Sequence, residues 1–306
     1  MSYWSKYSPY NAEIVATFER IKSKNFVLVD GGAAGLLSEP FDVAKSVILS
    51  VRFEPRGESE VIKSSQDIYI DGGLWSEDRK GSLHVAKEPA TSSICPPNVN
   101  FLKQFSDECG APPRETQELI EVPLRSIDSC VSNSEMPKPN FIKLDVHSAE
   151  LPALLGSKNS LENCVGLLVE TWNVEVHKGQ HLHYEIEKFA IENGFEVYDT
   201  ICAAAWPVKH NNQVNHNERR RYIGSEILFI RSDVSRELRL EKAFVLSLFG
   251  FYSVAQNLIC NFEQEGEEQL YFAIEQAKSK ASKLTARVKR FARKVYGYVR
   301  REYVSY

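Results

Sequence analysis

Acidic residues close several apolar segments of this chain, and their positions suit catalysis or ligand binding. Each follows a run typical of a buried parallel strand, as Asp30 follows residues 26–29. The acids concerned are Asp30, Glu54, Asp71, Asp145 and Glu170. Ligands of open α/β sheets lie beyond the carboxyl ends of the strands, so these side chains would share one edge. Taken singly, each acid could instead cap a helix or pair with Arg or Lys.

A run of small residues after the first predicted strand indicates a turn that opens a helix. Gly and Ala side chains leave room for a ligand to approach the backbone. The turn contains neither GxGxxG nor a Walker lysine, which favours a nucleoside without phosphates, such as S-adenosylmethionine. We expect the turn to hold the methionine part, Glu54 the ribose hydroxyls, and Asp71 or its glycine neighbours to border the adenine. The predicted cofactor-binding residues are Asp30, Gly31, Gly32, Ala33, Gly35, Glu54 and Asp71.

The hydrophobic pattern predicts seven strands, the early ones alternating with helices, and a helical region from about residue 235. The fold class is therefore α/β, with a Rossmann-like seven-stranded sheet and a helical C-terminal extension. The last two strands could form an antiparallel pair. The predicted strands are 26–29, 47–54, 67–71, 141–146, 165–170, 195–199 and 226–230. Helices are predicted at 8–24, at 182–193, and from an N-cap at Ser148 to Gly156. Short strands are predicted at 82–85 and 119–124, and loops at 86–100 and 207–221.

Three segments resemble the FkbM-type methyltransferase family: FIKLDVHSAELPALLGS, VGLLVETWNVEVHKGQ and FAIENGFEVYD. The upstream DGGAAG and RFEPR also fit, and the resemblance covers roughly residues 26–231. Ser148 departs from the pattern, since the family usually has Gly there. The resemblance implies a class I methyltransferase fold and S-adenosylmethionine-dependent O-methylation, commonly of a sugar hydroxyl in polysaccharide, antibiotic or glycolipid biosynthesis. The matching positions are Lys143, Asp145, Glu150, Gly156, Glu170, Gly194 and Phe195.

Methyl transfer to a hydroxyl needs an aligned acceptor and a base that takes its proton. Asp145 is the first choice for that base or for a metal ligand, and Glu170 is the neighbouring candidate. His147 is an alternative base, because an ordinary imidazole titrates close to neutral pH; it could also be a solvated loop histidine. We expect Lys143 to pair with a carboxylate. Asp145, Glu170 and His177 could bind Mg²⁺ or Mn²⁺, but no spacing demands it, so no metal ligand is predicted.

The sequence is also compatible with a function of another class. A catalytically weak scaffold in a surface-glycan assembly is the main alternative, motivated by Ser148 and by a long basic extension. A nicotinamide-dependent oxidoreductase is disfavoured, because the pyrophosphate fingerprint is absent. The predicted acceptor is a saccharide or a glycolipid.

Charge is distributed unevenly along the chain. Residues 278–301 contain ten Lys or Arg and no acid, which leaves 27 basic against 41 acidic residues elsewhere, a net −14. The spacing over 283–303 predicts a basic amphipathic helix that could lie on an anionic membrane, pack on residues 236–276 or a second chain, or bind nucleic acid. The acidic body disfavours nucleic acid. The predicted domains are 1–233 (methyltransferase), 234–276 (helical) and 277–306 (basic helix).

The cysteine pattern and the N-terminus favour a cytoplasmic protein, with the inner membrane surface as an alternative location. Six cysteines are widely spaced without CxxC, as in reduced thiols, and the first residues have no apolar core typical of a signal peptide. Residues 243–262 carry no charge over a length that could span a bilayer. Polar residues dilute that segment, so two buried helices meeting near Gly250 are the preferred interpretation.

Overall fold

A computed structural model describes residues 9–22, 24–57, 66–215 and 217–283 of the 306-residue chain. Their contacts divide into two units, which are described separately. The larger unit contains residues 25–37 and 48–238, and the smaller contains α1 (Ala12–Ile21), residues 38–47 and the helices from Arg239 onward. The pattern-based domain boundaries at 233 and 276 stay a prediction.

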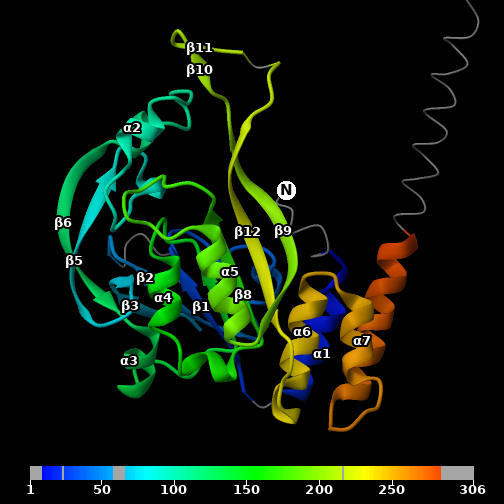
Figure 1. The fold of residues 1–306 in the computed structure, drawn as a ribbon. Coiled ribbons are helices and arrows are strands. Elements are labelled where there is room, and N and C mark those ends of the chain that lie inside the picture. The colour runs from blue at the N-terminus through cyan, green and yellow to red at the C-terminus, as the bar shows by residue number, and fades with distance from the viewer. Residues whose placement is uncertain (1–8, 23, 58–65, 216, 284–306) are drawn as a thin grey trace, which may run out of the picture. The chain divides into compact units, whose positions relative to one another are not determined.

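A seven-stranded sheet forms the larger unit, in the order β3-β2-β1-β7-β8-β12-β9 (Figure 1). The first five of these strands run parallel, and β12 is antiparallel to both of its neighbours. All seven predicted strands are present, and the antiparallel final pair is confirmed. The bounds are β1 (Phe26–Gly31), β2 (Ile48–Glu54), β3 (Ile68–Asp71), β7 (Phe141–Leu144), β8 (Gly166–Trp172), β9 (Phe195–Trp206) and β12 (Arg221–Arg231).

The strand order reverses between β1 and β7, where an open α/β sheet leaves its ligand crevice. Every residue of β1 is buried, as expected for a central parallel strand covered on both faces. Asn140 fixes the start of β7 beside β1. Its side-chain Oδ1 accepts a hydrogen bond from Val27 N at 2.9 Å, and its N donates to Val27 O at 2.8 Å. The carboxyl ends of β1 and β7 are thereby aligned.

Two helices, α4 (Glu150–Leu155) and α5 (His183–Glu192), lie side by side next to β8 (Figure 1). The prediction that Ser148 caps α4 is wrong. Ala149 is the N-cap, and Ser148 has φ +98°, which an N-cap does not adopt. The Glu150 carboxylate accepts from Ser148 N instead, at 3.0 Å. The helix ends at Gly156, as predicted.

An insertion between β3 and β7 forms a second sheet of three strands in the order β4-β6-β5. Its strands are β4 (Gly73–Leu74), β5 (Arg79–Ala86) and β6 (Thr116–Arg125), and β5 and β6 make a curved pair in Figure 1. They contain the short strands predicted at 82–85 and 119–124 but extend well beyond them. Two short helices follow β5 and β6 respectively: α2 (Val99–Leu102) and α3 (Ile127–Ser132).

The strands β9 and β12 continue past the sheet as a long two-stranded ribbon, with a small hairpin at its tip (Figure 1). That hairpin consists of β10 (Lys209–His210) and β11 (Gln213–Val214), so the predicted loop at 207–221 contains regular structure.

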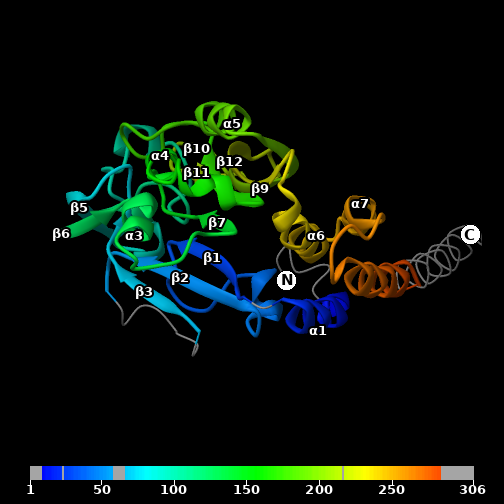
Figure 2. The ribbon, with the colours of Figure 1, turned by 90° about the horizontal axis from the view of Figure 1, so that it is seen from below.

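The smaller unit consists of helices. Phe18 of α1 stacks on Phe244 of α6 (Arg239–Leu248), with ring centroids 4.0 Å apart, and α1 lies beside α6 in Figure 2. The chain turns at Gly250 (φ +84°) into α7 (Tyr252–Ile259), which confirms two helices over the uncharged segment. Within the described residues, no helix has both the length and the apolar character to cross a membrane. The basic helix predicted over 283–303 lies outside the described residues beyond Lys283.

Candidate active site

A cavity of about 380 Å³ opens at the carboxyl ends of the central strands of the larger unit. Its wall combines the turn after β1, the end of β2, the segment after β7, and residues 89–94 of the insertion. The lining residues are Gly32, Ala34, Phe53, Glu54, Pro55, Arg56, Gly73, Leu74, Leu83, Pro89, Ala90, Ser92, Ser93, Ile94, Asp145, Val146, His147, Ala149 and Glu170. This is the edge that the strand-end acids predicted.

The glycine turn after β1 is narrow because two backbone segments meet there. Gly32 has φ +75°, and a Cβ at this position would lie 1.9 Å from Asp145 O. Gly32 and Ala34 line the cavity together with Phe53 and Glu54 of β2, whereas the predicted Gly31, Ala33 and Gly35 do not. Gly32 is therefore required for the close approach of the turn to β7, in addition to any ligand contact.

Asp30 lies beneath the turn and not in the cavity wall. Its carboxylate is 3.4 Å from Arg52 Nη2 and 3.3 Å from Lys143 Nζ, and all three side chains are buried. Arg52 also donates to Ala33 O at 2.7 Å. The expected pairing of Lys143 with a carboxylate is confirmed. Asp30 therefore links Lys143 of β7 to Arg52, and Arg52 in turn bonds the backbone of the turn.

Glu54 is the strand-end acid placed in the cavity on the cofactor side. It is 3% exposed, and its Oε1 accepts from Arg56 N at 3.0 Å and Arg56 Nε at 3.1 Å. Asp71, by contrast, is exposed, bonds Tyr69 Oη at 3.2 Å, and does not line the cavity. Gly73, two residues further on, does line it, so one of the two glycines after β3, not the acid, borders this space.

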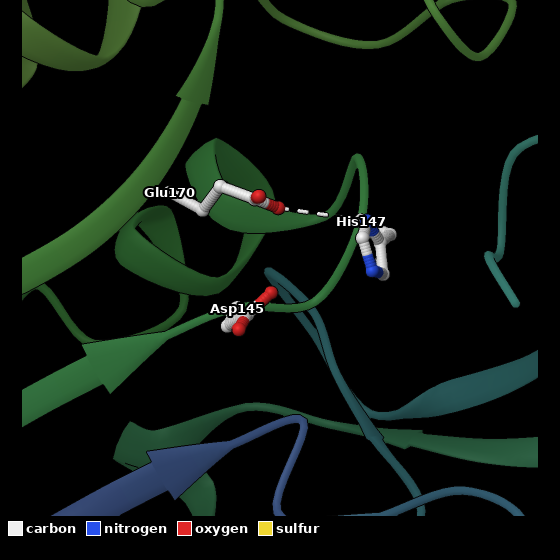
Figure 3. A group of neighbouring side chains, drawn as sticks. All are labelled: Asp145, His147 and Glu170. Carbon is white, nitrogen blue, oxygen red and sulfur yellow. Dashed lines mark ion pairs between the residues drawn. The ribbon is translucent and has the colours of Figure 1, made fainter. Parts of the chain in front are cut away.

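Asp145, His147 and Glu170 come together in the wall of the same cavity (Figure 3). Asp145 follows β7, His147 lies two residues further on, and Glu170 belongs to β8. One ligand atom from each lies within 4.8 Å of the others, and His147 Nδ1 is 3.5 Å from Glu170 Oε2. All three predicted catalytic candidates therefore form one cluster, called the acid–histidine cluster below.

The environment pushes the pKa values of the two acids apart. Burial is the largest influence on Asp145 and would raise its pKa, but Lys143, 3.9 Å from Oδ2, acts together with His147 and a hydrogen bond from Glu170 to hold that pKa below its ordinary value. Burial, reinforced by Asp145, raises the pKa of Glu170 well above its ordinary value. Burial also lowers the pKa of His147 and keeps the imidazole neutral. The cluster thus contains an ionised acid beside groups that can share a proton.

The turn that carries His147 is held in an unusual conformation. His147 has φ +46° and Ser148 has φ +98°. Ser93 Oγ donates to His147 O at 2.6 Å, and a second 2.6 Å bond joins Ser93 Oγ to Ser148 Oγ. Because the Ser93 proton goes to His147 O, the Ser148 hydroxyl must donate the second bond. The residue that departs from the family's usual Gly therefore stabilises the strained turn with its own hydroxyl.

His177, proposed with Asp145 and Glu170 as an alternative metal set, lies outside the acid–histidine cluster. It is 1% exposed, its ring centroid is 6.3 Å from that of His147, and burial lowers its pKa to about 3. Sequence reasoning missed Arg114, which is buried, lies 4.5 Å over the Trp206 ring and donates to Cys109 O at 2.6 Å. No pattern around Arg114 marks it.

Comparison with known proteins agrees with this geometry. The family model for the methyltransferase FkbM domain matches residues 44–197. No protein with a curated description matches the chain.

The similarity to solved structures is low. A crystal structure of methyltransferase FkbM from Methylobacillus flagellatus KT is 14% identical, covering 67% of this chain and 43% of that chain, with TM-score 0.35. Magnesium protoporphyrin IX methyltransferase from Synechocystis PCC 6803, solved with bound SAM, is 13% identical, covering 76% and 85%, with TM-score 0.30. The chain thus spans less than half the length of the first protein. The fold assignment rests on the strand order itself.

Proposed function

The chain belongs to the FkbM methyltransferase family, and we propose that it transfers a methyl group from S-adenosylmethionine to a hydroxyl of a saccharide. One observation carries this proposal. A single cavity extends from Gly32 and Glu54 to Asp145 and Glu170, so a nucleoside donor and a deprotonating group would face the same space.

The cofactor half of the cavity suits an adenosine without phosphates. Glu54 is buried at the end of β2, where doubly wound folds place the acid that accepts from ribose hydroxyls. Arg56 engages Oε1 of Glu54, and no described residue bonds its Oε2. The narrow turn at Gly32 lets the methionine part approach the backbone.

The acceptor half suits proton removal from a hydroxyl. The hydroxyl oxygen attacks the methyl carbon, the carbon–sulfur bond breaks, and S-adenosylhomocysteine leaves as a neutral thioether. The hydroxyl proton passes to the acid–histidine cluster, with Asp145 as the first acceptor because its lowered pKa keeps it ionised. The remaining rate acceleration comes from alignment of the acceptor oxygen with the methyl carbon, because the sulfonium donor is already activated.

Calorimetric titration with S-adenosylhomocysteine, followed by transfer assays with labelled S-adenosylmethionine on a panel of saccharides, tests the proposal. We expect one-to-one binding at micromolar concentration and labelling of at least one saccharide. Asp145→Asn should abolish transfer and leave the affinity for S-adenosylhomocysteine unchanged. Well-folded protein that binds no S-adenosylhomocysteine would overturn the proposal and favour the scaffold alternative. Binding with transfer only to acceptors that are not saccharides would overturn the substrate class alone.

A further inference from the structure

The acid–histidine cluster has the geometry of a cation site. Two ligand atoms bound to one ion at about 2.1 Å lie at most about 4.2 Å apart. The three atoms offered by Asp145, His147 and Glu170 lie within 4.8 Å of one another, so small side-chain movements would bring them onto one ion. All three line the cavity: Glu170 belongs to β8, and Asp145 and His147 follow the adjacent parallel strand β7 (Figure 3).

Several atoms in this region have no hydrogen-bond partner among the described residues. His147 Nδ1 and Glu170 Oε2 are both enclosed and unpaired, and their separation of 3.5 Å is too long for a good mutual hydrogen bond. His177, which is 1% exposed and next to His147, also has an unpaired Nδ1. An unpaired buried polar atom is unfavourable, and one shared ligand would satisfy both His147 Nδ1 and Glu170 Oε2.

The charge near the cluster leaves room for a cation. Lys143 is 3.9 Å from Asp145 Oδ2, but its ammonium lies closer to Asp30, at 3.3 Å. It is therefore shared between two carboxylates. Glu170 has no described ion pair except the contact with His147, which is charged only when protonated.

We propose that Asp145, His147 and Glu170 bind one divalent cation of the Mn²⁺ or Mg²⁺ class. Two carboxylates select a hard cation, and the imidazole shifts the preference toward Mn²⁺. Neighbouring backbone contacts fix the ligands. The Ser93 hydroxyl donates to the backbone carbonyl of His147, and the Glu150 carboxylate accepts from Ser148 N.

The cation deepens the proposed function, and its role in catalysis rests on that function. Bound to the acceptor hydroxyl, it would lower the pKa of that oxygen and fix its direction toward the methyl carbon. The hydroxyl proton would pass to a carboxylate oxygen of the cluster that is not bound to the ion. Cation binding itself does not depend on methyl transfer and can be measured alone.

Titration of the chelator-treated full-length chain with Mn²⁺, with free Mn²⁺ followed by electron paramagnetic resonance, tests the site. We expect one Mn²⁺ per chain without any cofactor present. Glu170→Gln and His147→Asn should each weaken Mn²⁺ binding by about tenfold or more, as loss of a ligand does. Thermal unfolding shows whether each variant is folded. If one of the two variants fails to fold, the other still tests the site.

Glu187→Gln is the matched control. Glu187 pairs with His183 at 3.0 Å on the partly exposed face of α5, so this variant also removes a carboxylate from a His–Glu pair. It should bind Mn²⁺ like the unmodified chain. The proposal is overturned if the unmodified chain binds no Mn²⁺, if both cluster variants bind it equally well, or if Glu187→Gln abolishes binding.

Titration with S-adenosylhomocysteine in the presence of chelator separates the two proposals. Binding of S-adenosylhomocysteine by a chain that binds no Mn²⁺ would overturn the cation site and leave the cofactor assignment standing. Binding of Mn²⁺ by a chain that binds no S-adenosylhomocysteine would support the cation site and overturn the proposed function.

Discussion

At the residue scale, the predictable part of the site is the set of acids that end buried strands. This rule predicts Glu54, Asp145 and Glu170 because the carboxyl ends of parallel strands meet at the same edge of the sheet. The same rule placed Asp71 in the site, where it does not lie, since β3 is near the sheet edge and its last residue is exposed. Arg114 approaches the site only through tertiary contacts, so the sequence alone does not predict its position.

Glu54 and Asp71 provide a matched test, because both are acids at the ends of neighbouring strands, paired in register. Glu54→Gln should weaken S-adenosylhomocysteine binding by about 1–3 kcal/mol, the cost of mispairing a buried hydrogen-bonding group. Asp71→Asn should leave the affinity unchanged, because Asp71 is exposed and outside the cavity. Calorimetric titration of both variants measures the difference. Equal affinities of Glu54→Gln and the unmodified chain would remove Glu54 from the cofactor site.

Glu150 should make folding stability depend on pH. It is 1% exposed, and burial raises its pKa from 4.5 to about 7. Its folded-state pKa lies above the unfolded one, so its contribution is fully present below about pH 4.5 and is lost as pH rises through 7. The loss amounts to roughly 2–3 kcal/mol. Glu150→Gln cannot ionise but can still accept from Ser148 N.

Urea unfolding of Glu150→Gln and of the unmodified chain at pH 5 and pH 8 measures this effect. The stability of the variant relative to the unmodified chain should rise by about 2–3 kcal/mol between these pH values. The difference cancels the titrating groups that do not interact with Glu150. Parallel curves for the two proteins would contradict a raised pKa at this position.

At the element scale, the buried strands were predictable and the exposed parts of the long strands were not. The predicted strand at 226–230 covers the C-terminal part of the mostly buried stretch 223–230 of β12, whereas Arg221 and Tyr222 at its start are exposed. The ribbon formed by β9 and β12 depends on pairing across a long connection, which local patterns do not reveal. The N-cap prediction at Ser148 is wrong because Ser148 adopts a positive φ in a turn formed by tertiary contacts, among them the bond from Ser93 to His147 O.

The turn after β1 gives a prediction at this scale. Gly32→Ala should destabilise the fold by about 3 kcal/mol or more, because the new Cβ would overlap Asp145 O and force β1 and β7 apart. Gly35→Ala is the control, since Gly35 also has positive φ (+80°) but has nothing within 4 Å of its Cβ position. It should cost only about 1 kcal/mol. Denaturant unfolding compares them, and equal losses would show that conformation, not the contact with β7, makes Gly32 necessary.

At the scale of the whole molecule, the C-terminal residues are basic whereas the rest of the chain has a net negative charge. Seven of the ten basic residues in 278–301 fall after Lys283, while the remainder of the chain outside 278–301 has a net charge of −14. A basic segment near an anionic lipid surface gains about 1 kcal/mol for each Lys or Arg, and salt weakens this attraction. The same acidic excess elsewhere would repel the phosphates of nucleic acid.

Removal of residues 284–306 should therefore abolish binding to vesicles that contain phosphatidylglycerol and leave S-adenosylhomocysteine binding unchanged, because the cavity lies wholly within residues 32–170. The full-length chain should bind these vesicles at low salt, release them at high salt, and ignore vesicles of phosphatidylcholine alone. Cosedimentation measures all three. If the full-length chain ignores the anionic vesicles and its truncation instead changes the sedimentation coefficient from dimer to monomer, the segment pairs two chains. A truncation that lowers the thermal stability of the helical unit without either effect would show that the segment packs on its own chain.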